Sequence, residues 1–217
     1  MKIGVIVALD QEYAQIVKLL GGRPDGRIGE NDVVLRRSGI GKVNAAVGAV
    51  ELIDKEHPDC IISTGVAGGL SHDLKSLDVV AADKIVYHDV WCGEGNALGQ
   101  VQGLTERFVC DRTLYSKALT LGAHGGLLCS GDWFVSTEEE ADRILGHFPE
   151  GIACDMESAA LAQVCCLREI PFQSIRIISD VAGDDHQQHY DNFWKTVAED
   201  SFENIRKYLF SLPSSLR

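Results

Sequence analysis

Short runs of β-branched and other apolar residues alternate along the chain with longer segments in which apolar residues recur at helical spacing. The short runs predict buried strands, and the segments with helical spacing predict helices. We expect strands at residues 2–9, 33–38, 60–65, 77–89, 125–130, 151–156 and 173–180. We expect helices at residues 10–20, 42–55, 112–121, 138–145, 157–167 and 192–209. This alternation is typical of an α/β domain.

Several of the expected strands are apolar at nearly every position rather than at every second one. Because continuous hydrophobicity indicates burial on both faces, these runs predict a largely parallel sheet covered by helices on both sides. No low-complexity linker or repeat divides the chain, and 217 residues with 45% hydrophobic content suit one compact core. We therefore expect residues 1–217 to form a single domain.

The ends of the expected strands carry most of the polar and glycine-rich positions. In open α/β sheets, ligands bind beyond the carboxyl ends of the strands. Five of these ends read "DQE" (10–12), "GVAGG" (65–69), "SGDWF" (130–134), "CDMES" (154–158) and "SDVAGDD" (179–185). Acids here also suit helix N-termini, a role open to Asp10 and Glu157. Helix capping does not explain the aromatic pair Trp133-Phe134 or the glycine-rich turn, which favour a ligand pocket.

The glycine motifs "TGVAGGL" (64–70) and "SGIGKV" (38–43) do not have the spacing of a dinucleotide-binding or a phosphate-binding loop. These glycines either make tight turns or let the backbone approach a flat ring or a sugar.

The amino-acid composition limits the classes of molecule that the protein is expected to bind. With 32 acidic and 20 basic residues, the formal charge of −12 repels nucleic acid and anionic membranes, so a small molecule or a protein is the expected partner.

The seven cysteines form no C-x-x-C pair, which favours reduced thiols in a cytoplasmic protein over disulfides or a metal site. No apolar run approaches the roughly 20 residues that span a bilayer. The polar stretch "DDHQQH" (184–189) could suggest a metal site, but a solvated loop or a lid over the active site is favoured.

The chain resembles the 5′-methylthioadenosine/S-adenosylhomocysteine nucleosidases of the purine nucleoside phosphorylase superfamily along nearly its full length. The motifs that carry the resemblance are "KIGVIVALDQE", "SGIGKVNAA", "ISTGVAGGL", "YHD", "SGDWF", "CDMESAALAQVC" and "IRIISDVA". The resemblance implies a single α/β domain with a central twisted mixed β-sheet flanked by helices in three α/β/α layers. It also implies a homodimer and an enzyme that needs no cofactor.

The resemblance implies roles for three acids. Cleavage of an adenine N-glycosidic bond leaves an oxocarbenium-like ribose, and it needs a protonated leaving base and an activated water. Asp180 would protonate or hydrogen-bond N7 of adenine, and Glu12 would be the general base that activates the water. Glu157 would accept hydrogen bonds from the ribose 2′- and 3′-hydroxyls. The predicted products are adenine and the corresponding thioribose.

The remaining predicted substrate-binding positions follow from the same resemblance, and ordinary core packing is the alternative for each of them. Phe134 would stack on adenine, the backbone of Val135 would bind its edge, and Ser179 would hold Asp180. The ribose would lie near Met156, Ala67, Gly68 and Arg176, and the 5′-alkylthio group near Leu9, Ile40 and Tyr190.

The sequence departs from the family pattern at three places. Val66 stands where the family often has a serine, so a hydroxyl near the ribose ring oxygen is missing. Leu9 replaces a common methionine. Residues 90–100 align with the segment that reaches a partner's pocket in the family, but they are smaller here, so the 5′ pocket is roomier or Trp91 fills it.

Three other functions stay open at this point. A phosphorylase of the same superfamily would need basic residues around the attacking phosphate, whereas the first strand end offers Asp10 and Glu12. Other adenosine derivatives, such as adenosine, AMP or an aminofutalosine-type compound, are alternative substrates of a hydrolase. A catalytically silent nucleoside-binding protein is the third alternative, although retention of all three acids argues against it.

Overall fold

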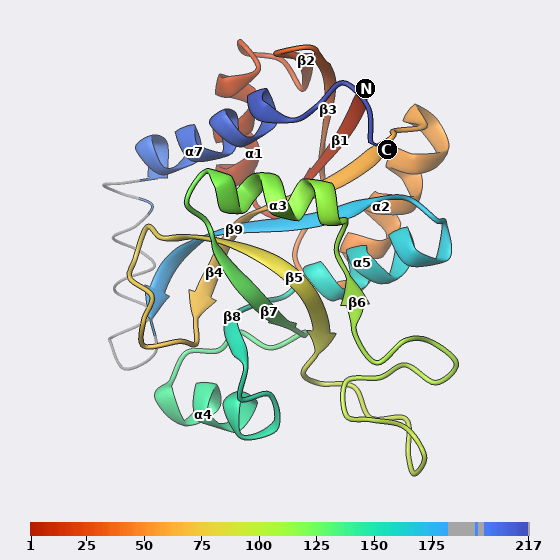
Figure 1. The fold of residues 1–217 in the computed structure, drawn as a ribbon, viewed down its shortest axis with the longest axis vertical. Coiled ribbons are helices and arrows are strands. Elements are labelled where there is room, and N and C mark those ends of the chain that lie inside the picture. Colours follow the sequence, from red (N-terminus) through yellow and green to blue (C-terminus); the bar gives the residue numbers. More distant parts are fainter. Residues whose placement is uncertain (182–193, 195–197, 217) are drawn as a thin grey trace.

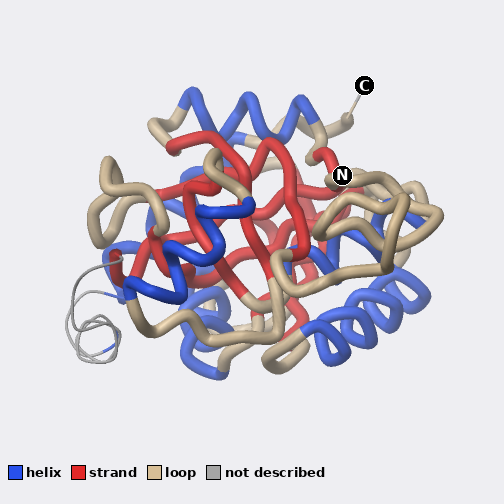
Figure 2. The backbone as a smooth tube through the Cα atoms, turned by 90° about the horizontal axis from the view of Figure 1, so that it is seen from below, coloured by secondary structure: helices blue, strands red, loops and turns tan. Residues whose placement is uncertain are grey.

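A central β-sheet is surrounded by helices in the computed structural model, which describes residues 1–181, residue 194 and residues 198–216 (Figures 1 and 2). The strands are β1 (Lys2–Val7), β2 (Asp25–Ile28), β3 (Asn31–Arg37), β4 (Cys60–Gly69), β5 (Val79–Tyr87), β6 (Phe108–Val109), β7 (His124–Ser130), β8 (Gly151–Asp155) and β9 (Phe172–Val181). The helices are α1 (Asp10–Leu19), α2 (Lys42–Glu56), α3 (Arg112–Thr120), α4 (Glu138–His147), α5 (Ser158–Leu167) and α7 (Ala198–Ser211).

Each strand and helix predicted from the hydrophobic pattern has a counterpart in this structure. The short strands β2 and β6 were not predicted, because four and two residues are too few to show a period. The predicted helix at 192–209 falls partly outside the described residues, and its described part, α7, ends at Ser211. Asp10 does not cap α1: Leu9 holds the N-cap position, and the Asp10 carboxylate pairs with Arg37 Nη1 at 3.0 Å.

The sheet is mixed, as the family resemblance implied, and it is less parallel than the apolar strands alone predicted. Its order is β2-β3-β1-β4-β8-β7-β5-β6, and β9 pairs with both β4 and β5. Five of the described strand pairings are parallel and four are antiparallel. Because β9 joins β4 to β5, the strands β4, β8, β7, β5 and β9 form a closed ring of pairings.

The two faces of the sheet are buried against different helices, which explains the continuously apolar strands. On β1, Ile3 and Val5 belong to one core that also contains Ile16 of α1 and Phe202 of α7. Ile6 points the other way, into a core built with α2 and α5. Since successive residues of a strand point to opposite faces, both faces need apolar side chains. The structure is therefore a three-layer α/β/α domain (Figure 2).

Met1, which precedes β1, lies beside the last described residues, and its ammonium donates a hydrogen bond to the Ser214 carbonyl at 3.0 Å (Figure 1). Within the described residues, no helix combines the length and the apolar character needed to cross a membrane.

Candidate active site

A cavity of about 120 Å³ opens where several strands end. It lies beyond the carboxyl ends of β1 and β3, beside the last residues of β4, β8 and β9, and under the loop that follows β7. Its lining residues are Ala8, Leu9, Glu12, Ile40, Val66, Ala67, Gly68, Trp133, Phe134, Val135, Cys154, Asp155, Met156, Glu157, Ser179 and Asp180. The fold thus brings the polar strand ends of the sequence to one place, as the α/β pattern predicts.

Every predicted site residue except Arg176 and Tyr190 lines this cavity. Arg176 lies beneath the cavity, and Tyr190 lies outside the described residues. The stretch "DDHQQH" at 184–189 and the suggested lid over the active site are also outside the described part of the chain. Among the lining residues, Ala8, Cys154 and Asp155 had been given no role from the sequence.

Glu12 is buried, and backbone N–H groups from two segments hold its carboxylate. Ala8 and Leu9 donate to Oε2, and Val66 of β4 donates to Oε1, each at 2.9 Å. Burial raises the pKa of Glu12, while the Arg176 charge and these three hydrogen bonds act in the opposite direction. The carboxylate is therefore fixed in place, and its burial favours the protonated form.

Glu157 is buried at the start of α5, facing the first turn of α2. Its Oε1 accepts a hydrogen bond from Gly41 N–H at 2.9 Å. Burial and the nearby charge of Asp155 raise the pKa of Glu157 to about 7, against the attraction of Arg176 and the Gly41 hydrogen bond. This carboxylate is a hydrogen-bond acceptor whose charge changes near neutral pH.

Asp180, buried near the end of β9, is supported by its neighbour. Ser179 Oγ donates to Asp180 Oδ1 at 2.5 Å and lies 3.3 Å from the Ala67 carbonyl oxygen of β4. A Cβ on Gly68 would lie 3.8 Å from Asp180 Oδ2, so the bare backbone of β4 passes close to this carboxyl group. The arrangement fixes one carboxyl group at the wall of the cavity.

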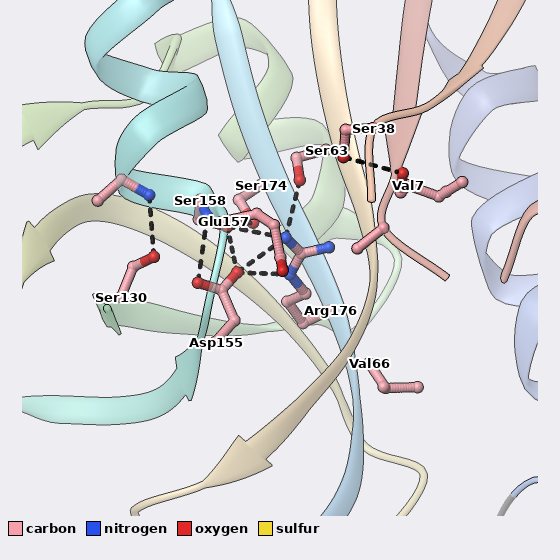
Figure 3. Close-up of polar contacts among 12 residues, drawn as sticks. Val7, Ser38, Ser63, Val66, Ser130, Asp155, Glu157, Ser158, Ser174 and Arg176 are labelled. Carbon is pink, nitrogen blue, oxygen red and sulfur yellow. Dashed lines mark hydrogen bonds and ion pairs between the residues drawn. The ribbon is translucent and has the colours of Figure 1, made fainter. Parts of the chain in front are cut away.

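A buried ion pair lies below these acids (Figure 3). Arg176 Nε donates to Asp155 Oδ2 at 2.8 Å, and Nη2 forms an ion pair with the same oxygen at 2.8 Å; the side-chain exposures are 4% and 2%. Arg176 Nη2 also donates to Ser63 Oγ at 2.8 Å and to Ser158 Oγ at 3.0 Å. The sequence placed Arg176 near Glu157, but its direct partner is Asp155, and it acts on Glu12 and Glu157 through its charge.

The cavity thus combines carboxyl groups with an apolar, partly aromatic wall. The Phe134 side chain is 47% exposed at the opening and offers a flat face to a ring. Among the described lining residues none is Lys, Arg or His, so none of these residues offers a positively charged side chain to a ligand. The geometry suits a neutral ligand with a flat heterocycle and hydroxyl groups, and proton transfer to and from it.

Comparison with known proteins identifies the family. The family model of the phosphorylase superfamily matches residues 2–212. The chain is 36% identical to the 5′-methylthioadenosine/S-adenosylhomocysteine nucleosidase of Geobacillus thermodenitrificans over 235 aligned positions, which cover both chains completely. It is also 36% identical to the enzyme of the same name from Aeromonas salmonicida, covering 98% of this chain and 100% of the relative.

Solved structures of such nucleosidases have the same fold. The Colwellia psychrerythraea enzyme in complex with adenine superposes with a TM-score of 0.93 at 31% identity, covering 100% of this chain and 97% of that one. The Neisseria meningitidis enzyme in complex with methylthio-immucillin-A has a TM-score of 0.90 at 38% identity, covering 97% and 99%. This chain therefore belongs to the 5′-methylthioadenosine/S-adenosylhomocysteine nucleosidase family of the phosphorylase superfamily.

Proposed function

We propose that the protein hydrolyses the N-glycosidic bond of 5′-methylthioadenosine and S-adenosylhomocysteine, releasing adenine and the corresponding thioribose. The observation that carries this proposal is the meeting of Glu12, Glu157 and Asp180 in one small cavity with an aromatic wall. The names of the full-length relatives, and the adenine and methylthio-immucillin-A bound by two of the similar structures, support the same substrate class.

The three acids divide the reaction between them. Asp180 donates a proton or a hydrogen bond to N7, so the electron pair of the breaking C1′–N9 bond moves into a neutralised adenine. Glu12 takes a proton from water, and the water oxygen forms the new bond to C1′. Glu157 accepts hydrogen bonds from the 2′- and 3′-hydroxyls and stabilises the positive charge that develops on the ribose.

Apolar and backbone groups orient the substrate in this proposal. Phe134 stacks on adenine, and the backbone of Val135 binds its edge. Met156, Ala67 and Gly68 lie along the ribose. Leu9 and Ile40 face the 5′-alkylthio group, where one extra methyl or thioether is worth about 1–3 kcal/mol. Tyr190, predicted for the same pocket, is outside the described residues.

Water rather than phosphate is the proposed nucleophile. An attacking phosphate needs cationic or N–H partners. The described lining residues include no cation, and the N–H groups of Ala8, Leu9 and Val66 already bind Glu12. The same absence argues against AMP, because a 5′-phosphate would meet no basic side chain among the described lining residues.

The test is to incubate the protein with 5′-methylthioadenosine, with and without phosphate, and to follow free adenine. Equal release in both conditions is expected, whereas phosphate-dependent release would make the protein a phosphorylase. Glu12→Gln and Asp180→Asn should lose turnover and keep the fold. Asp10→Asn is the matched control, because this acid is two positions from Glu12 and its side chain is 81% exposed. No release by the wild type would favour a nucleoside-binding protein.

We further propose that residues 1–217 act as one nucleosidase domain in a cytoplasmic homodimer. All seven cysteines are free, which suits a reducing compartment. Val43 and Val47 are 73% and 52% exposed one turn apart on α2, next to Ile40 at the cavity. An apolar helix face at this place suits a second copy. Light scattering should give twice the chain mass, and Val43→Glu should reduce it to one chain mass. A wild-type monomer would contradict the dimer.

A further inference from the structure

The turn at residues 38–42 connects β3 to α2, and its Gly41 N–H donates a hydrogen bond to Glu157 Oε1. Gly41 has a φ of +89°, in the region that favours glycine. A Cβ there would also lie 2.9 Å from Asp132 Oδ1. The turn is therefore fitted closely against Asp132, which comes from the loop after β7.

Asp132 holds the start of α2. Its Oδ1 accepts the Lys42 N–H at 2.8 Å, one residue after the N–H that binds Glu157. Two consecutive N–H groups thus donate to two carboxylates from different loops. Gly41 donates to Glu157, and Lys42 donates to Asp132. Any rotation of this turn that releases Asp132 also turns the Gly41 N–H away from Glu157.

Asp89, in the loop after β5, fixes Asp132 in turn. Asp89 Oδ2 accepts both the Asp132 N–H and the Lys42 ammonium, each at 2.8 Å. A Cβ on Gly131 would lie 2.7 Å from Asp89 Cγ and from the His88 ring, so the two loops are in direct contact. Lys42 therefore binds Asp89 through its side chain and Asp132 through its backbone.

A second path connects Lys42 to the helix that follows Glu157. The Lys42 ammonium lies 5.5 Å from the centre of the Tyr87 ring. Tyr87 Oη donates to Gln163 Oε1 of α5 at 2.8 Å. The first turn of α2 is therefore connected to α5 in two places, through Glu157 before its first residue and through Tyr87 and Gln163 farther along the helix.

We propose that Asp132, fixed by Asp89, is a positioning residue for substrate binding: it holds the first turn of α2 so that Gly41 N–H keeps the Glu157 carboxylate aimed at the ribose. This inference rests on the proposed nucleosidase function for its substrate. If Asp132 only capped α2, it would need neither its hydrogen bond to Asp89 nor the neighbouring contact between the Gly41 N–H and Glu157.

The kinetic test compares Asp132→Ala with Asp132→Asn and Asp111→Ala. Asp111 is the matched control, because it caps α3 by accepting the Thr113 and Leu114 N–H groups at 2.9 and 3.0 Å, away from the cavity. Asp132→Ala should lower kcat/KM for 5′-methylthioadenosine about fivefold or more, the effect of about 1 kcal/mol of lost capping, because Glu157 both binds the ribose hydroxyls and stabilises the charge that develops on the ribose. Asp132→Asn keeps an acceptor oxygen and should restore kcat/KM. An unchanged kcat/KM in Asp132→Ala, or the same change in Asp111→Ala, would overturn the proposal.

A second measurement needs no turnover, so it separates this inference from the proposed function. The titration of Glu157 can be followed by carboxyl-carbon NMR, with the signal assigned by its loss in Glu157→Gln. Asp132→Ala should raise the titration midpoint, because the Gly41 hydrogen bond that favours the ionised form is weakened. Asp132→Asn should not raise it, and the other charged groups that act on Glu157, which are Asp155, Arg176 and Glu12, stay in place. An unmoved or lowered midpoint in Asp132→Ala would refute the proposal even if the wild type released no adenine.

Discussion

The Glu12 carboxylate occupies the space that a side chain at position 65 would need, since a Cβ on Gly65 would lie 2.7 Å from Glu12 Cδ. Gly65 also has a φ of +148°, which L side chains rarely adopt. Strand β4 can therefore pass under Glu12 only with glycine at this position. The next residue, Val66, then donates its N–H to Glu12 Oε1.

Replacing Gly65 should consequently remove activity by displacing Glu12. Gly65→Ala is expected to lower kcat/KM for 5′-methylthioadenosine about 100-fold or more, the loss that follows a shift of about 1 Å in a catalytic group. The measurement is the rate of adenine release. Gly146→Ala is the control, because Gly146 lies in α4 with nothing within 4 Å of its Cβ position. Near-normal rates in Gly65→Ala would contradict the role of Glu12.

The raised pKa of Glu157 predicts how stability depends on pH. Its ordinary value is 4.5 and burial raises the pKa of Glu157 to about 7, so the folded state binds the proton more tightly than the unfolded state. This contribution to stability is fully present below pH 4.5, falls as the pH rises to 7, and is lost above it. The difference corresponds to about 3 kcal/mol.

Glu157→Gln removes this titration and should therefore become more stable relative to the wild type as the pH rises from 5 to 8. Urea unfolding of both proteins at several pH values measures the change. The acidic control is Glu203→Gln, because Glu203 is exposed and pairs with Arg206 on α7. A constant difference between wild type and Glu157→Gln across this range would show that Glu157 titrates normally.

Substitutions at the buried ion pair of Arg176 and Asp155 should affect stability and activity differently. Arg176→Met leaves Asp155 buried without its cation and should lower the free energy of unfolding by about 3–5 kcal/mol. Adding Asp155→Leu removes the unpaired charge and should recover much of that loss. Adenine release should stay low in the double variant, because Glu12 and Glu157 no longer have a nearby positive charge. Full activity in the stable double variant would limit Arg176 to a structural role.

Much of the site could be predicted because strand ends are visible in the sequence. An apolar run that stops at Ser179-Asp180 or at Asp155-Met156 marks a sheet edge, and parallel strands bring such edges together. The role of Asp155 was missed because two acids stand within three positions in "CDMES", and only the fold shows that Asp155 meets Arg176. The end predicted for the strand at residues 60–65 was also too early: β4 continues to Gly69 and pairs with both β8 and β9.

The contacts around Lys42 could not be predicted, because they join three loops that are far apart in the sequence. Lys42 is separated by 47 positions from Asp89 and by 90 positions from Asp132. Each of these residues alone resembles an ordinary charged residue in a loop. No periodic pattern connects them, and in the sheet only β5 and β7 are neighbours, while β1, β4 and β8 lie between β3 and β7.

Replacing Ser179 should show how strongly catalysis depends on the orientation of the Asp180 carboxyl group, the proposed proton donor. Its hydroxyl donates to Asp180 Oδ1 at 2.5 Å and so helps to orient that carboxyl group. Ser179→Ala should lower kcat about tenfold with little change in KM, because adenine and ribose keep their other contacts while Asp180 loses this hydrogen bond. The cost in stability should be about 1 kcal/mol, that of one hydrogen bond. Ser211→Ala is the control, because it removes a hydroxyl that donates to the Tyr208 carbonyl in α7. An unchanged kcat in Ser179→Ala would mean that Asp180 does not depend on the Ser179 hydroxyl for its orientation.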